Sequence, residues 1–213
     1  MKGIVILGAG GHAKVVLSTA LAAGLSVEGI FDDDDTKWGQ KLLDVPVLGP
    51  LEMLRSERLP RAVIAIGDNR VRKRIVERFD GCCEWITVVH PRAFVHQSVR
   101  VGRGTVIFVG TVIQPDTVVG DHVILNTGVT VDHDCTIGSF VHLAPGVHLA
   151  GSVVVEEGGF LGIGSVVIPG QRVGQWATVG AGAVVVRDVP PLTTVAGIPA
   201  KPLVEQSHPL EKA

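Results

Sequence analysis

The sequence predicts a chain in two parts: a small α/β domain of the βαβ type, corresponding to half of a Rossmann-like unit, and then an all-β parallel β-helix. Three observations carry this prediction. An aliphatic residue recurs every six residues from 95 to 190, strand-like and helix-like runs alternate before that repeat, and the 213 residues include 27 glycines but only 4% aromatics. The expected parts are the α/β domain at 1–88, the β-helix at 89–190, and a C-terminal extended segment with a tail at 191–213.

The repeat consists of sixteen consecutive six-residue blocks that begin at Val95 and run without insertion to Pro190. Every block begins with Val, Ile or Leu, and its fifth residue is usually small or β-branched. One block supplies a short strand and a corner, so three blocks complete a triangular coil with the aliphatic side chains inside. Such coils stack in parallel and contact only their neighbours, which makes a six-residue period typical of a β-helix.

The residues before the repeat alternate between strand and helix patterns, which is typical of a βαβ domain with a parallel sheet. The expected elements are a strand at 2–7, a helix ended by Gly24, strands at 27–31 and 62–66, and a helix at about 70–79. Ligands of such sheets bind beyond the carboxyl ends of the strands. The glycine turn at 8–13, the aspartates at 32–35 and the segment 67–69 all follow those ends, so we expect a binding site there.

The glycine turn Gly8-Ala9-Gly10-Gly11-His12-Ala13 matches the pattern with which dinucleotide-binding folds hold a pyrophosphate. A complete nicotinamide domain needs about twice the length available before the repeat, whereas half of one suffices for a mononucleotide. A nucleotide-linked or other small anionic substrate is therefore favoured, and a nicotinamide cofactor and a purely structural turn are the alternatives. Backbone N–H groups at a helix start can hold phosphate, and Asp32 or Asp33 can accept from a nucleobase or a ribose.

One block is unusually polar, the hexad Val131-Asp132-His133-Asp134-Cys135-Thr136. An imidazole beside carboxylates on a rigid corner suits general-base chemistry, because histidine titrates near neutral pH and a carboxylate can fix its tautomer. A solvated corner histidine is the alternative, but Asn126, His142 and His148 add polar groups to nearby corners. The hexad register makes Cys135 a packing residue, which argues against a covalent acyl-enzyme.

A zinc site is a further alternative for the histidines. His142 and His148 are separated by five residues, and no third ligand stands at an obvious position. We therefore expect no metal.

Composition excludes several classes of function. A net charge of −2 argues against nucleic acid as a partner. Three cysteines, two of them adjacent at Cys82 and Cys83, form neither a disulfide framework nor a spaced zinc motif, and are typical of reduced cytosolic thiols. No signal peptide is evident and no apolar run approaches the roughly 18 residues of a membrane span. We expect a cytoplasmic protein that does not bind membranes.

Five segments together resemble the sugar O- and N-acetyltransferases built on hexapeptide repeats: GAGGHAK at 8–14, IAIGDN at 64–69, NTGVTVDHDCTIG at 126–138, VGAGAVV at 179–185 and AGIPAKP at 196–202. That family includes the sialic acid O-acetyltransferases and the N-acetyltransferases of UDP-linked amino sugars and GDP-perosamine. The resemblance covers nearly the whole chain. It implies a left-handed β-helix and homotrimers with active sites between neighbouring β-helices.

The resemblance also implies residue roles. It assigns the general base to His133 and the carboxylate that orients it to Asp134, a position where the family often has Glu. The positions that match acetyl-CoA contacts are His142, Gly151, Ile163 and Ala181. The positions that match sugar-nucleotide contacts are Gly11, His12, Asp32, Asp33 and Gly67.

We therefore expect an acetyl-CoA-dependent N-acetyltransferase that acetylates the amino group of a nucleotide-linked amino sugar by direct transfer, for surface glycan or lipopolysaccharide assembly. O-acetylation of sialic acid or another sugar hydroxyl is the alternative within the class. A trimeric scaffold with a ligand-sensing N-terminal domain is the alternative outside it. The aspartates at 32–35 favour a base with N–H donors over a free sugar acid, whose carboxylate they would repel.

Overall fold

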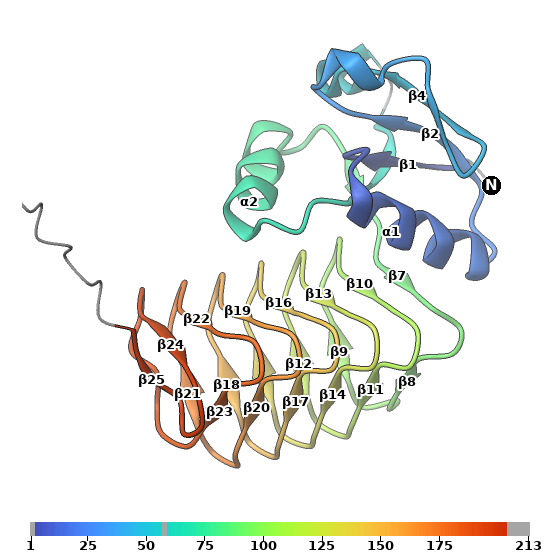
Figure 1. Ribbon diagram of the computed structural model, residues 1–213. Coiled ribbons are helices and arrows are strands. Elements are labelled where there is room, and N and C mark those ends of the chain that lie inside the picture. The colour runs from blue at the N-terminus through green and yellow to red at the C-terminus, as the bar shows by residue number, and fades with distance from the viewer. Residues whose placement is uncertain (1–2, 57–58, 204–213) are drawn as a thin grey trace, which may run out of the picture.

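A computed structural model describes residues 3–56 and 59–203 (Figure 1). Its N-terminal domain is a six-stranded sheet in the order β3-β4-β2-β1-β5-β6, parallel except for the β3–β4 pair. The strands are β1 (Ile4–Leu7), β2 (Val27–Phe31), β3 (Lys41–Leu42), β4 (Val45–Gly49), β5 (Arg61–Ile64) and β6 (Glu84–Trp85). The helices are α1 (Gly11–Ala22), α2 (Asn69–Arg78) and the short 3-10 helices η1 (Asp35–Lys37) and η2 (Leu51–Ser56). The predicted βαβ domain is confirmed; strands β3, β4 and β6 were not predicted.

The rest of the chain forms a β-helix of three sheets, which are parallel except at β25. From β7 to β23 the strand partners lie 18 residues apart, as Thr130 and His148 do. The first sheet contains β7 (Val88–Val89), β10 (Val106–Ile107), β13 (Ile124–Leu125), β16 (His142–Leu143), β19 (Phe160–Leu161), β22 (Thr178–Val179), β24 (Thr194–Ala196) and β25 (Lys201–Pro202). The second contains β8 (Phe94–Val95), β11 (Val112–Ile113), β14 (Thr130–Val131), β17 (His148–Leu149), β20 (Val166–Val167) and β23 (Val184–Val185). The third contains β9 (Arg100–Val101), β12 (Val118–Val119), β15 (Thr136–Ile137), β18 (Val154–Val155) and β21 (Arg172–Val173).

Each corner of the coil turns through a residue with positive φ at the fourth position of its hexad. This holds for fourteen consecutive hexads, at residues 104, 110, 116, 122, 128, 134, 140, 146, 152, 158, 164, 170, 176 and 182. Eight of these residues are glycines, which adopt this conformation without steric cost. Six are not, Asp134 among them with φ 59°, and such residues are strained by about 1 kcal/mol or more.

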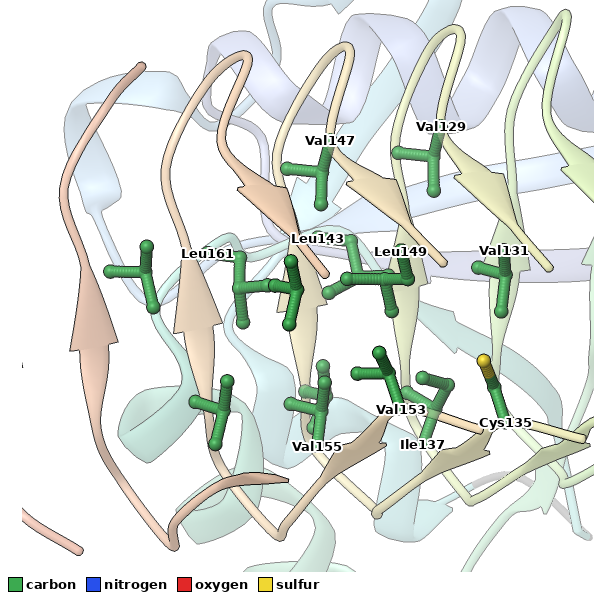
Figure 2. Packing of buried hydrophobic residues seen from close by; sticks show 14 of the residues in the cluster. Val129, Val131, Cys135, Ile137, Leu143, Val147, Leu149, Val153, Val155 and Leu161 are labelled. Carbon is green, nitrogen blue, oxygen red and sulfur yellow. The ribbon is translucent and has the colours of Figure 1, made fainter. Parts of the chain in front are cut away.

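The interior of the β-helix is filled by the first and fifth residues of each hexad. Figure 2 shows Val131, Leu149 and Val155 inside the coils, and Cys135 packed among them with its sulfur inward. Cys135 is 1% exposed, which confirms its predicted packing role. Thr105, Thr111 and Thr117 occupy the fifth position in earlier hexads and bond a carbonyl of the neighbouring coil through their buried hydroxyls.

The N-terminal domain covers the first strands of the first sheet, β7, β10 and β13, and both α1 and α2 lie on this side of the β-helix (Figure 1). Val88, Val106 and Ile124 point outward from β7, β10 and β13, and they are buried in one cluster with residues of α1 and β1. In later strands of the same sheet, Phe160 of β19 and Thr178 of β22 are only partly buried. The domain thus leaves the later strands of the first sheet, β19 and β22, open.

Arg72 joins the two domains through backbone carbonyls. Its side chain is 1% exposed, and its guanidinium donates to the carbonyls of His122 and Phe140 at 2.8 Å each and of Ile66 at 3.0 Å. It also donates to the side chain of Asn69 at 2.8 Å. One buried cation therefore fastens α2 and the loop after β5 to two neighbouring corners of the β-helix.

The C-terminal segment continues the first sheet. β24 pairs in parallel with β22, and β25 folds back antiparallel on β24. The segment expected to be extended thus contains two strands, because its backbone caps the last coil. The tail predicted at 208–213 lies outside the described residues. Within 3–56 and 59–203, no helix has the length and apolar character needed to cross a bilayer.

Replacing Arg72 by Met should lower the free energy of unfolding by roughly 3 kcal/mol or more, because several buried carbonyls lose their donor. Urea unfolding measures this loss. Lys73→Met is the matched control, since Lys73 makes a partly exposed ion pair with Glu157 and its loss should cost about 1 kcal/mol or less. Equal losses in the two variants would contradict the role assigned to Arg72.

Candidate active site

His133 and Asp134 lie at the corner between β14 of the second sheet and β15 of the third. His133 Nδ1 is 2.7 Å from Asp134 Oδ2, and both side chains are more than half exposed. A carboxylate only accepts, so Nδ1 carries the proton and Nε2 is left to take one. Asp134 has a positive φ and its carboxylate reaches the ring of the preceding residue, so the short side chain of an aspartate suffices here.

Gly151 occupies the same corner one coil further on. A Cβ at Gly151 would lie 2.7 Å from both Cε1 and Nε2 of His133, so the ring rests against a position that only glycine leaves free. Both residues line an open cavity of about 410 Å³, here called the corner cavity, together with Asp132, Ala150, Ser152, Pro169 and Gly170. Gly151 therefore lies directly beside the ring of His133.

Neighbouring carboxylates raise the pKa of His133 above its ordinary value. The hydrogen bond to Asp134 is the largest cause, and the negative charge of Asp132 adds to it. A raised pKa makes the neutral ring a stronger base, provided that the pH is high enough to deprotonate it.

His142 lies on β16 and faces the N-terminal domain. Its Nδ1 is 3.1 Å from the carbonyl oxygen of Gly67, which only accepts, so Nδ1 carries the proton. Its Nε2 then accepts from Asn126 Nδ2 at 3.3 Å. Burial lowers the pKa of His142 to about 4, and the nearby Arg72 cation adds to this effect, so the ring is neutral at physiological pH.

His142 lines a cavity of about 420 Å³, the sheet cavity, over the open part of the first sheet. Its walls are the segment 67–70, His142, Gly158, Phe160, Trp176 and Thr178. His12 lies close by, with its ring centroid 6.0 Å from that of His142 and 5.5 Å from that of Phe108. His12 Nε2 is buried without a hydrogen-bond partner in the described chain, and burial lowers the pKa of His12 to about 4.

A third cavity, the domain cavity, lies at the carboxyl ends of β1, β2 and β5. It measures about 410 Å³ and is lined by Gly8, Asp32, Asp33, four apolar side chains (Leu51, Ile66, Val71, Ile75), and two arginines, Arg74 and Arg78. The start of α1 beside it has no side-chain N-cap and no acidic residue in its first turn. The expected position of a binding site at these strand ends therefore coincides with a cavity.

Asp32 and Asp33 both have structural partners. Asp32 Oδ2 accepts from the backbone N–H of Ala9 at 2.6 Å and thereby ties β2 to the glycine turn. Burial opposes ionisation of Asp32, but backbone hydrogen bonds and Lys37 outweigh it and lower the pKa. Asp33 accepts from the Leu51 N–H at 2.9 Å and from Arg78 at 2.7 Å.

The residues that the resemblance assigns to acetyl-CoA do not meet in one chain. Gly151 lies on the edge between the second and third sheets, Ile163 and Ala181 on the edge between the first and second, and His142 on the first sheet. Ile163 is 62% exposed on its edge. Their roles remain predictions. The sequence analysis missed Arg70, Arg72, Arg74 and Trp176, although the five basic residues within α2 were visible as a signal.

The described part of the chain contains no group of three His, Cys, Asp or Glu side chains that could hold a metal ion. His142 and His148, the pair considered for zinc, lie on different sheets.

Comparison with known proteins identifies the family. The PglD N-terminal domain matches residues 3–79. PerB from Caulobacter crescentus, solved in complex with CoA and GDP-perosamine, is 43% identical, with a TM-score of 0.90 over 96% of this chain and 98% of that one. The chain belongs to the sugar N-acetyltransferases with hexapeptide repeats. The acetyltransferase domain of PglB from Neisseria gonorrhoeae is 38% identical, with a TM-score of 0.88 over 95% and 100% of the two chains.

Matches among curated proteins are partial. The UDP-N-acetylbacillosamine N-acetyltransferase of Bacillus subtilis (strain 168) is 39% identical over 111 residues. That match covers 50% of this chain and 51% of the relative, so the chain spans about half the length of this curated relative.

Asp134→Asn should lower the pKa of His133 toward its ordinary value, because the variant loses both the charge and the hydrogen bond to a carboxylate. The titration of the His133 Cε1–H resonance by NMR measures this. Asp132→Asn is the matched control and should lower the pKa less, since Asp132 acts only through its charge. An Asp132→Asn effect larger than that of Asp134→Asn would contradict the orienting role of Asp134.

Proposed function

We propose that the protein transfers the acetyl group of acetyl-CoA to the amino group of a nucleotide-linked amino sugar. The main supporting observation is the 2.7 Å hydrogen bond between His133 Nδ1 and Asp134 Oδ2. It leaves Nε2 of His133 free, beside Gly151 in an open cavity. The whole-length similarity to PerB, which was solved with CoA and GDP-perosamine, supports both substrates. The PglB domain, 39% identical in its complex with acetyl coenzyme A, supports the donor.

In the proposed reaction the substrate nitrogen attacks the thioester carbonyl carbon while His133 Nε2 takes the proton that this nitrogen loses. Asp134 stabilises the resulting imidazolium. The C–S bond then breaks, and the departing CoA sulfur receives the proton from His133. A backbone N–H near Gly151 stabilises the oxyanion, an effect that is often large in acyl transfer.

Direct transfer fits the surroundings of Cys135 better than a covalent intermediate does. Cys135 is buried inside the coil, and burial raises the pKa of its thiol. A thiolate, not a thiol, is the nucleophile in acyl transfer, so this cysteine is poorly suited to carry an acetyl group.

The N-terminal domain would hold the nucleotide. The domain cavity offers apolar walls for a base, and Gly11 begins a helix whose free N–H groups can face phosphate. The sheet cavity, with Gly67 and His142 in its wall, would hold the amino sugar. His12 and the carboxylates of Asp32 and Asp33 would hold the glycine turn and the walls of the domain cavity in position around the nucleotide.

A homotrimer would complete the site. His133 and Gly151 stand on one edge of the second sheet, and Ile163 and Ala181 stand on the other edge. The outer face of this sheet is largely apolar and is partly buried or exposed, with Phe94, Val112, Thr130, His148, Val166 and Val184 in line. Packing of this face against a second copy would bring the two edges together and would place acetyl-CoA between subunits.

A thiol-release assay tests the proposed function. Purified protein and acetyl-CoA should release CoA with one of several nucleotide-linked amino sugars (UDP-, GDP- or dTDP-linked) and not with free sialic acid. His133→Asn should lower kcat by about 10²–10⁴-fold while the fold and the oligomer stay unchanged. Turnover with sialic acid alone would replace the proposal with O-acetylation, and an unchanged kcat in the variant would remove His133 from the mechanism.

Mixing two inactive variants tests the shared site. His133→Asn damages one edge of the second sheet, and Ile163→Asp, at an exposed position, should damage the other. Randomly mixed trimers should regain roughly a quarter of wild-type activity. A site is intact only where the undamaged edge of one variant meets the undamaged edge of the other, and random mixing gives this in about a quarter of the sites. Sedimentation as a monomer, or no recovery in verified mixed trimers, would contradict a site between subunits.

A further inference from the structure

Two arginines on α2 have no role in the proposed reaction so far. Arg70 lines the sheet cavity, and Arg74, one helical turn later, lines the domain cavity. Both also line a smaller cavity of about 250 Å³ with Lys73, Glu77 and Trp176. The outer face of α2 therefore carries a row of positive charge from one large cavity to the other.

The neighbouring cations are already neutralised. Arg78 pairs with Asp33 at 2.7 Å and with Glu52 at 3.0 Å, and Lys73 pairs with Glu157 at 2.6 Å. These ion pairs leave little of their charge for a ligand.

Arg70 and Arg74 differ from them. In the ranges that the structure describes, neither makes an ion pair with a carboxylate, and Arg70 instead lies 4.5 Å above the ring of Trp176. Glu77 lines the small cavity beside them, but it is not within ion-pair distance of either guanidinium. Two unneutralised guanidinium groups thus face the space between the cavities.

We propose that Arg74, assisted by Arg70, binds the diphosphate of the sugar nucleotide, with the nucleoside in the domain cavity and the amino sugar in the sheet cavity. This inference rests on the proposed function. The start of a helix supplies only about half a positive charge, which is less than a diphosphate requires. A guanidinium adds a full charge and a planar pair of donors that match phosphate oxygens.

Calorimetric titration with UDP, GDP and dTDP, and with the corresponding nucleosides, tests this. Arg74→Gln should weaken binding of the preferred diphosphate by about tenfold to a hundredfold and should leave nucleoside binding unchanged. Arg74→Lys, which keeps the charge but loses the planar fork, should lie between. Arg103→Gln is the matched control, because this exposed arginine pairs with Asp121 on a β-helix corner and lines none of the cavities.

The outcomes separate the inference from the proposed function. Equal diphosphate affinity in Arg74→Gln and the wild type would overturn the inference and leave the proposed function standing. A loss that is equally large for the nucleoside would also overturn it, since Arg74 would then shape the base pocket. Failure of the wild-type protein to bind any of the diphosphates would overturn both.

Discussion

The buried guanidinium of Arg72 is the interaction on which the arrangement of the two domains depends. Its donors satisfy carbonyls of the β-helix corners at 122 and 140 and of the loop at 66–67, so one side chain fixes where α2 sits. Burial lowers the pKa of Arg72 to about 9, which still leaves it charged at neutral pH. A buried cation is costly unless it is fully hydrogen-bonded, and this one is surrounded by carbonyl oxygens. Because Arg72 holds α2 in this position over the first sheet, the sheet cavity forms between them.

The 18-residue coil converts sequence spacing into columns of side chains. His133 and Gly151 form one such pair, and His142, Phe160 and Thr178 form a column on the first sheet. On a third column the rings of His122 and Phe140 stack with their centroids 5.4 Å apart, next to the carbonyls that Arg72 binds. A rigid coil therefore positions chemical groups with little freedom of its own, as an active site requires.

The polar hexad was detectable in the sequence because its register fixes which residues are inside. Val131 and Cys135 had to be buried, so Asp132, His133 and Asp134 had to form an exposed corner, and the structure agrees. The basic residues of α2 were not separable in the same way. Arg70, Arg72, Arg74 and Arg78 look alike in sequence, yet one is buried against carbonyls, one lies over a tryptophan, one lines the domain cavity and one is paired with carboxylates.

The sequence by itself determined the β-helix, its coil length and the burial of each hexad position, because an aliphatic residue every six residues places one buried side chain on each face of a three-sided coil. It also determined that the first 80 residues form a βαβ domain and that His133 and Asp134 share one exposed corner. Only the tertiary structure decided which face of the β-helix the N-terminal domain covers, and therefore that His142 faces Gly67 while Ile163 stays exposed. That choice depends on contacts between residues 50–90 positions apart, such as Arg72 with His122 and Asn69 with Gly158, which no local pattern records.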